Sequence, residues 1–443
     1  MAAHTLKRGI TLLQATAINM IDMVGIGPFV VMPIVVSYFH SGLFIWAWVF
    51  GAFVAFVDGM IWSELGAKYP LAGGTYNFHR IAFGEKGGRL MSFLFVWQTS
   101  IQAPLVVASG AIGFAQYLDY LVHLNFWQQK LVSGGLVIIV FLLLYRKIET
   151  IGKISVVFGW IVILTILWII IGGLSNAQHG IDILPPAGQS FFTNAFVAAI
   201  GYGSVQTVYS YLGYYNVCHL GAEIQKPEQN IPKSIFISIV GIALLYLLMN
   251  VSVMSVLNPQ SISKNDNHLV SSFMQQLYGT NAGAIVTVLI LCVALSSLFA
   301  VVLGYSRVPY AAAVDGNFFK AFAKLHPTKE FPYISLIILC SIAFAFSLLF
   351  KLADVIKAIL TMRILVQFIA QAVGVVLLRR RLGTKDLPFK MWLFPIPVIL
   401  SVVVWIFLFY STGKFAFGGM AFALAGLIVY LIKAKLQAGS ATK

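Results

Sequence analysis

Two glycines and two prolines interrupt the first long apolar stretch of the chain, in the run Met-Val-Gly-Ile-Gly-Pro-Phe-Val-Val-Met-Pro at residues 23–33. Glycine weakens a helix by roughly 1 kcal/mol relative to alanine, and a proline inside a helix costs about 3 kcal/mol. In lipid, the freed backbone N–H and C=O groups cannot bond to water, so such a break survives only where it faces protein or a wet cavity. The break therefore predicts backbone groups that hold a polar solute at mid-membrane, which favours a transporter.

The composition places most of the chain in a lipid bilayer. The sequence is 60% hydrophobic and 10% charged, whereas a soluble domain is about 25% charged. The net charge of +15 comes from basic residues in short loops and at segment ends rather than from one basic face, which argues against a nucleic-acid partner. Cys218, Cys292 and Cys340 are scattered in apolar stretches and form neither a disulfide framework nor a zinc spacing.

A transmembrane helix needs about 20 apolar residues. We predict an all-α integral membrane protein with twelve transmembrane helices, near 10–36, 42–66, 88–118, 130–145, 151–173, 192–219, 233–256, 283–306, 333–350, 354–378, 391–410 and 415–433. The stretches 130–145 and 333–350 are short and are the weakest matches.

The basic residues test this assignment, because lysine and arginine concentrate in cytoplasmic loops. If the N-terminus is cytoplasmic, nearly all lysines and arginines outside the spans fall on the cytoplasmic side. The opposite side receives only Lys130, Lys264, Lys351, Lys357 and Lys414. We therefore expect a multi-pass protein of an inner or plasma membrane with both termini in the cytoplasm.

A second interrupted span occupies the sixth position, where Gly201-Tyr-Gly203 precedes the aromatic run 209–216. Interruptions in spans one and six suggest two five-span repeats of opposite topology, over about 10–173 and 192–378. Residues 1–390 would then form the transport core. Residues 391–443 would add two further transmembrane helices and a cytoplasmic tail.

Each interruption offers a candidate site. Unwinding at Gly25-Ile26-Gly27 would leave amides at a half-helix N-terminus, whose partial positive charge favours a carboxylate. Close helix packing through small residues is the alternative. In the sixth span, Gly213 is flanked by aromatic rings that either pack or close over a substrate, namely Tyr209, Tyr211, Tyr214 and Tyr215.

Asp22 and Asp58 lie inside spans one and two. An aspartate at a helix centre costs roughly 2.5–3.5 kcal/mol on insertion scales, so it needs a partner or a function. Arg363 is the candidate counter-charge, and Arg363, Gln367 and Gln371 recur at a spacing of four, which makes one polar stripe on a helix. A static ion pair and proton coupling through either aspartate are both open, as is the choice of aspartate that meets Arg363.

Ser296 and Ser297 could supply hydroxyl ligands to Na⁺, although serine in a membrane helix usually bonds the preceding turn. Glu64, Glu223 and Asp315 lie near cytoplasmic ends beside basic residues, so we expect structural or gating pairs there. The histidines are dispersed, and we find no nucleophile elbow, phosphate-binding loop or His-Glu-x-x-His motif. We expect no enzyme activity and no cofactor; H⁺ and Na⁺ are the candidate coupling ions.

Four sequence motifs follow one another along the chain: Gly-Ile-Gly-Pro-Phe at 25–29, Ser-Glu-Leu-Gly-Ala-Lys-Tyr-Pro-Leu-Ala-Gly-Gly-Thr-Tyr at 63–76, Ala-Glu-Ile-Gln-Lys-Pro-Glu-Gln-Asn-Ile-Pro-Lys-Ser at 222–234, and Tyr-Ser-Arg-Val-Pro-Tyr-Ala-Ala-Ala-Val-Asp-Gly at 305–316. Together they resemble the amino acid–polyamine–organocation superfamily, nearest its L-type amino-acid transporter branch. The resemblance covers spans one to ten.

The resemblance implies a LeuT-type five-plus-five inverted-repeat fold with alternating access around a central amino-acid site. The first-span amides would bind the substrate α-carboxylate, and carbonyls of both broken spans would bind the α-amino group. Tyr209 matches the aromatic gate that closes over the substrate. Gly213 of the second break is added to the residues that match the family's site. The predicted substrate site is therefore Met23, Gly25, Ile26, Gly27, Tyr209, Leu212 and Gly213.

Two departures from the family pattern leave the coupling mechanism open. Ile26 replaces the family's serine between the glycines, and Val162 stands where many members carry a lysine. Sodium at Ser296 and Ser297, protons at Asp22, and uncoupled exchange are therefore all retained as hypotheses. A polyamine or organic-cation carrier of the same fold is the alternative substrate class, and a nutrient-sensing receptor is the alternative function. No pattern in the sequence indicates an oligomeric state.

Overall fold

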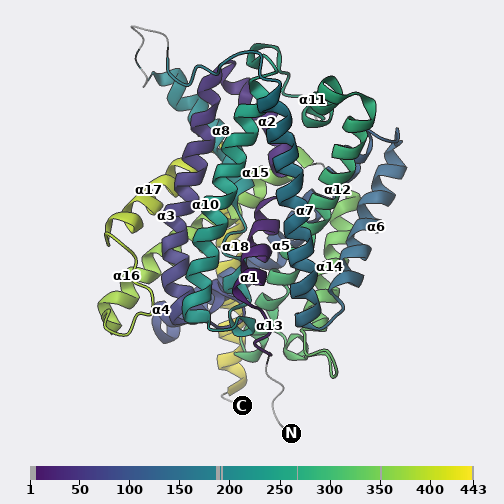
Figure 1. The fold of residues 1–443 in the computed structure, drawn as a ribbon. Coiled ribbons are helices and arrows are strands. Elements are labelled where there is room, and N and C mark those ends of the chain that lie inside the picture. Colours follow the sequence, from purple (N-terminus) through teal and green to yellow (C-terminus); the bar gives the residue numbers. More distant parts are fainter. Residues whose placement is uncertain (1–5, 186–189, 191–192, 267, 350–351, 442–443) are drawn as a thin grey trace.

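The computed structural model describes residues 6–441 apart from 186–189, 191–192, 267 and 350–351 (Figure 1). Within these residues the chain is helical, with two isolated backbone bridges and no strand. The expected spans 192–219 and 333–350 each include one residue outside the described part of the chain. Lys351, which we expect on the external side, and residue 192, where the second repeat is expected to begin, also lie outside it.

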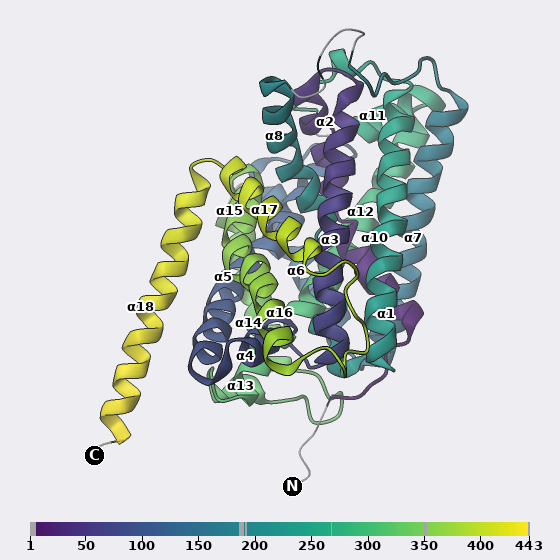
Figure 2. The ribbon, with the colours of Figure 1, turned by 90° about the vertical axis from the view of Figure 1, so that its left-hand side faces the viewer.

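The first half of the chain forms the following helices: α1 (Leu12–Met23), α2 (Gly27–Phe39), η1 (Gly42–Phe44), α3 (Ile45–Lys68), α4 (Thr75–Ala82), α5 (Gly84–Leu118), α6 (Phe126–Leu144) and α7 (Ile148–Ser175). The second half, up to the two further helices predicted after residue 390, forms α8 (Asn194–Tyr211), α9 (Asn216–His219), η2 (Gly221–Glu223), α10 (Pro227–Met254), η3 (Pro259–Ser261), α11 (Leu269–Tyr278), α12 (Thr280–Tyr305), α13 (Arg307–Val314), η4 (Lys320–Ala323), α14 (Tyr333–Leu349), α15 (Leu352–Arg363), the π-helical turn η5 (Ile364–Ile369) and α16 (Ala370–Leu382). The last two are α17 (Ile396–Ser411) and α18 (Phe415–Ala441), and α18 runs along one side of the bundle (Figure 2).

The long helices are apolar enough to cross a bilayer. Eight helical segments in the described part of the chain meet this condition by length and composition, and α1 and α2 together make a ninth that bends by 45°. The shorter apolar helices α14 and α17 coincide with the ninth and eleventh predicted spans. The helices therefore fall where the hydropathy predicted them, and the chain is a multi-pass membrane protein.

The first predicted span is not one continuous helix. It begins at a capping box, in which the side chains and backbones of Thr11 and Gln14 bond reciprocally. α1 then ends at Met23, and α2 restarts at Gly27 and continues to Phe39, three residues beyond the expected end. α2 tolerates its first proline because Pro28 lies in the first helical turn, where its missing N–H is not needed.

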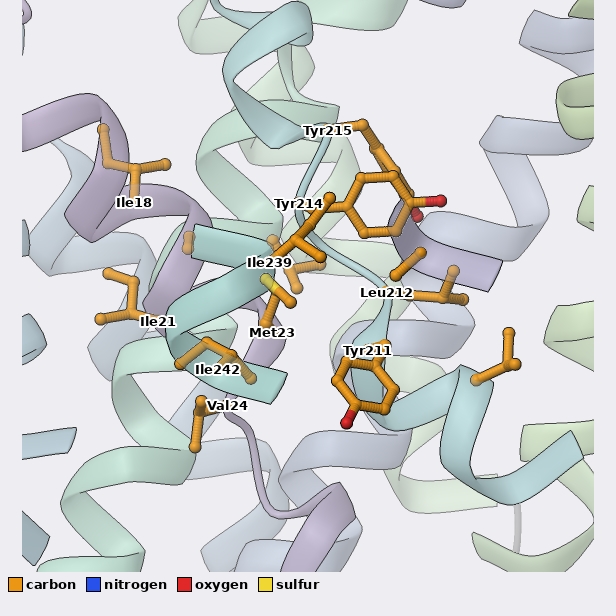
Figure 3. Close-up of a cluster of buried hydrophobic side chains, with 14 of the residues drawn as sticks. Ile18, Ile21, Met23, Val24, Tyr211, Leu212, Tyr214, Tyr215, Ile239 and Ile242 are labelled. Atoms are coloured by element: carbon orange, nitrogen blue, oxygen red, sulfur yellow. The ribbon is translucent and has the colours of Figure 1, made fainter. Parts of the chain in front are cut away.

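The two interrupted segments pack against each other in the core. The Tyr246 hydroxyl of α10 lies within hydrogen-bond distance of the carbonyl of Met23 (2.9 Å) and of that of Ser210 (3.2 Å), so one side chain contacts both helix ends. The Asn19 side chain of α1 accepts a bond from the backbone N–H of Val217 (3.0 Å). Figure 3 shows apolar side chains of α1, α10 and the α8–α9 connection gathered around this junction.

Three acidic residues pair with arginines of α4, α13 and α16, helices that lie toward the end of the bundle where α1 starts and α18 finishes (Figures 1 and 2). Glu64 pairs with Arg379, Glu223 with Arg307, and Asp315 with Arg80. Tyr76 also donates to Asp315 (2.6 Å), and burial with the help of this carboxylate raises the pKa of Tyr76, so its hydroxyl stays a donor. The expected pairing of the acidic residues at helix ends is confirmed.

The Arg307–Glu223 pair predicts a large stability effect. Both side chains are buried, and the guanidinium donates two bonds of 2.8 Å to the carboxylate. Arg307→Ala leaves a buried, unpaired carboxylate, which should cost about 3–5 kcal/mol and lower the thermal unfolding midpoint by several degrees. As the control, Lys7→Ala breaks the exposed Lys7–Glu149 pair and should leave the midpoint unchanged. Equal midpoints for both variants would contradict this role.

Candidate functional site

A central cavity lies where the two interruptions meet. Its walls include backbone and side chains of the α1–α2 junction, the end of α8, and the facing sides of α5 and α12. All seven predicted substrate residues line it, namely Met23, Gly25, Ile26, Gly27, Tyr209, Leu212 and Gly213. The structure therefore brings together two sequence segments that are nearly two hundred residues apart.

At the glycines of the first interruption, no side chain separates the backbone from the cavity. A Cβ atom built on Gly25 would lie 2.8 Å from the Ser297 hydroxyl, and one on Gly27 would lie 3.5 Å from the Tyr209 ring. In the described part of the chain, the amides of Gly25, Ile26 and Gly27 donate to no backbone carbonyl. Because these amides lie at the first residue of α2 or just before it, they form a helix N-terminus with free donors at the cavity.

Tyr209 forms part of the opposite wall. Its ring packs against Leu105 and Ile359, and its hydroxyl lies 3.2 Å from the Ser109 hydroxyl of α5. The side chain is only partly buried. The ring lies beside Gly27, at the end of a broken helix, and packs against the edge of the main core.

Asp22 lines the cavity but does not pair with Arg363. Its carboxylate accepts a bond from the Asn216 amide (2.6 Å), which also donates to the Ala300 carbonyl (2.7 Å). Arg363 instead donates to the Tyr215 hydroxyl. No ion pair joins Arg363 to either aspartate in the described residues, so of the alternatives left open by the sequence the static pair is not formed in this structure.

Asp58 does not line the cavity, and its carboxylate is fully hydrogen-bonded to neighbouring side chains. Its buried carboxylate accepts bonds from the Trp62 indole (2.8 Å) and the Tyr214 hydroxyl (2.6 Å). The Ser401 hydroxyl and the Trp405 indole of α17 donate to its other oxygen at 3.3 Å. These four donors satisfy the carboxylate and join α3 to the α8–α9 connection and α17, so neither proton coupling nor pairing with Arg363 is needed to explain it.

The two candidate sodium ligands have different surroundings. Ser297 lines the cavity and its hydroxyl donates to the Asp22 carbonyl (3.3 Å). Ser296 donates to the Val293 carbonyl in the preceding turn (2.7 Å), which is the ordinary role of a helical serine. Among the described residues, no group of His, Cys, Asp or Glu is arranged to hold a metal ion. Of these two serines, only Ser297 is therefore placed to contact a small ion in the cavity.

The polar stripe on the tenth span is interrupted by the π-helical turn η5. Only Arg363 of the three polar residues lines the cavity. Gln371 accepts a bond from the Thr75 hydroxyl of α4 (2.6 Å), and Gln367 is fully buried and does not line the cavity. A π turn closes its hydrogen bonds one residue later than an α-helix does, so the side chains after it no longer follow the register of a regular α-helix.

Two residues of the site, Asn216 and Tyr305, were not singled out from the sequence, whereas Tyr215 was named only as a ring beside Gly213. Asn216 holds Asp22, while Tyr215 and Tyr305 contact the Arg363 guanidinium. The signals that could have found Asn216 and Tyr305 are an asparagine beside the second interruption and a tyrosine that opens the fourth motif.

Several known proteins with related sequences are named as amino-acid permeases or transporters. The sequence pattern of the family described as "Amino acid permease" matches residues 10–432. The chain is 27% identical to the uncharacterised amino acid permease YecA of Bacillus subtilis (strain 168) over 331 residues, which is 74% of each chain. It is 24% identical to the serine/threonine exchanger SteT of the same strain over 445 residues, or 96% of each chain. It is 25% identical to the Asc-type amino acid transporter 1 of Mus musculus over 444 residues, or 96% of this chain and 81% of the relative. These matches confirm the resemblance in the four motifs, and the chain belongs to the amino acid permease family.

Proposed function

We propose that this permease is a secondary transporter that moves amino acids across the membrane by alternating access. The observation that carries the proposal is the cavity at the meeting point of two interrupted helices, with unbonded amides on its wall. We further propose that the chain crosses the membrane twelve times with both termini cytoplasmic. Spans one to ten would form the LeuT-type inverted repeat, and α17 and α18 would be added to it.

The cavity suits the two charged groups that all amino acids share. The α-carboxylate would bind the free amides of Gly25, Ile26 and Gly27, where the N-terminus of α2 carries partial positive charge. The α-amino group would bind carbonyls at the C-terminal ends of α1 and α8, at Met23 and Leu212, with the carbonyl of Tyr209 beside them. The Met23 carbonyl already accepts one bond from Tyr246, and its second lone pair can accept another.

The same geometry weighs against a polyamine carrier. A polyamine carries only positive charges, and the Arg363 guanidinium on the cavity wall would repel it. Asp22 alone offers one carboxylate, whereas an amino acid also gains from the free amides. The amino-acid substrate is therefore the better fit to the charges present.

A ligand screen tests this proposal. The purified protein would be unfolded thermally in the presence of each of the twenty amino acids, of polyamines and of nucleobases, with and without Na⁺. A ligand that binds only the folded state raises the apparent stability by mass action. We expect amino acids to raise the midpoint and polyamines to leave it unchanged. Stabilisation by polyamines alone would overturn the proposal.

Proton coupling through Asp22 is the mechanism that we propose. Asp22 lies at the end of α1, on the cavity wall, and one amide donor holds its carboxylate. Asp22→Asn should therefore abolish accumulation driven by an imposed pH gradient in proteoliposomes, while substrate exchange continues. Asp58→Asn is the control: it should lower stability, because an asparagine cannot accept all four bonds, without removing the pH response. Unchanged pH-driven uptake in Asp22→Asn would leave that residue a structural role, with sodium near Ser297 or plain exchange as the driving mode.

A further inference from the structure

Arg363 places a buried positive charge on the wall of the central cavity. Its side chain is only 3% exposed, donates to the Tyr215 hydroxyl and lies over the Tyr305 ring, with Cζ 5.3 Å from the ring centroid. Neither contact supplies a negative charge. Within the described part of the chain, its Nε has no hydrogen-bond partner and its guanidinium forms no ion pair.

Three other arginines of the protein each have a carboxylate partner for the guanidinium. The buried guanidinium of Arg307 and the largely buried one of Arg379 each bind a glutamate through two bonds. The more exposed Arg80 also has a carboxylate partner. A buried guanidinium without an anion is strongly unfavourable, and its planar fork matches a carboxylate in shape. The missing carboxylate at Arg363 is therefore expected from a ligand in the cavity.

Asp22 supplies the opposite charge in the same cavity but is held elsewhere. Asn216 binds its carboxylate and is itself fixed to the Ala300 carbonyl of α12. The cavity thus presents an unpaired cation, a carboxylate and the free amides at the start of α2. A ligand that complements all three carries one ammonium group and two carboxylates.

We propose that Arg363 binds the side-chain carboxylate of a dicarboxylic amino acid, aspartate or glutamate, and thereby determines the substrate specificity of the transporter. The inference rests on the proposed function, in which the α2 amides bind the α-carboxylate. The α-amino group lies toward Asp22 and the helix-end carbonyls. The second carboxylate is then the group that reaches Arg363. A neutral amino acid leaves the guanidinium without an anion, so it binds more weakly.

Matched ligands and matched variants test this assignment. Binding of L-aspartate, L-asparagine and L-serine to the purified full-length protein would be measured by thermal-unfolding titration. Asparagine has nearly the shape of aspartate without the charge. A charge-assisted bond predicts that the wild-type protein binds aspartate about 10- to 100-fold more tightly than asparagine. Arg363→Gln should erase most of this ratio, and Arg363→Lys should retain part of it because the charge remains.

The control substitution lies on the next turn of the same helix. Gln367 is buried and does not line the cavity, so Gln367→Leu should leave the aspartate-to-asparagine ratio at its wild-type value. Wild-type protein that binds asparagine or serine as tightly as aspartate would overturn the inference and leave the proposed function intact. If Arg363→Gln weakened the binding of all three ligands equally, the inference would also be overturned, because the guanidinium would then bind the α-carboxylate. If no amino acid binds, the proposed function itself fails.

Discussion

Gly213→Ala is expected to abolish amino-acid uptake and to lower the stability of the protein. Gly213 has a φ of +123°, in a region of backbone conformation that side chains rarely adopt. A Cβ atom there would lie 2.7 Å from the backbone nitrogen of Met23 and 2.8 Å from the carbonyl carbon of Asp22. Since both are backbone atoms of the first interruption, the two breaks would have to separate, and the cavity between them would change shape. Uptake into proteoliposomes and the thermal unfolding midpoint measure the two effects.

Gly279→Ala separates backbone strain from this steric clash. Gly279 also has a positive φ, +86°, but a Cβ atom there meets no atom within 4 Å. We expect this control to cost some stability and to leave uptake near the wild-type rate. Wild-type uptake by Gly213→Ala would show that the two interruptions need not touch during transport.

Tyr209→Ala is expected to abolish uptake while the protein still folds and reaches the membrane. The Tyr209 ring is partly buried, lies beside Gly27 and forms one wall of the cavity, so its removal opens that wall without emptying the main core. Uptake of a radiolabelled amino acid would be compared at equal amounts of protein in the membrane.

Tyr209→Phe is the matched control for this gate. It keeps the ring and removes only the hydroxyl that contacts Ser109 at 3.2 Å. A closing ring needs its apolar area more than its hydroxyl, so most of the uptake should remain. A gate at Tyr209 would be refuted by normal transport in Tyr209→Ala.

Much of the fold was predictable because a bilayer imposes simple rules. Helix lengths follow from hydropathy, and the ranges of α3, α12 and α14 agree with the predicted spans to within a few residues. The first interruption was predictable from Gly25, Gly27 and their neighbouring prolines, because lipid penalises broken helices strongly. The wall residues around both breaks were predictable from the family resemblance.

The partners of the charged residues were not predictable, because a hydropathy pattern does not say which helix faces meet. Asp58 and Asp22 gave the same signal in the sequence, yet one receives four donors from three segments and the other lines the cavity. The stripe from Arg363 to Gln371 assumed regular α-helical spacing, and the π turn between them removes that regularity. Tertiary contacts decide the outcome for the two aspartates, and a local change of helix type decides it for the stripe.

The most direct test of the central claim asks whether the shared carboxylate of amino acids is required for binding. Exchange of a radiolabelled amino acid in proteoliposomes would be challenged with unlabelled L-serine, L-aspartate, their α-methyl esters, and a polyamine. Free amides at Gly25, Ile26 and Gly27 predict competition by the free amino acids and a large loss of competition when the α-carboxylate is esterified. Equal competition by the esters, or competition by the polyamine alone, would contradict the account of an amino acid held by the two broken helices.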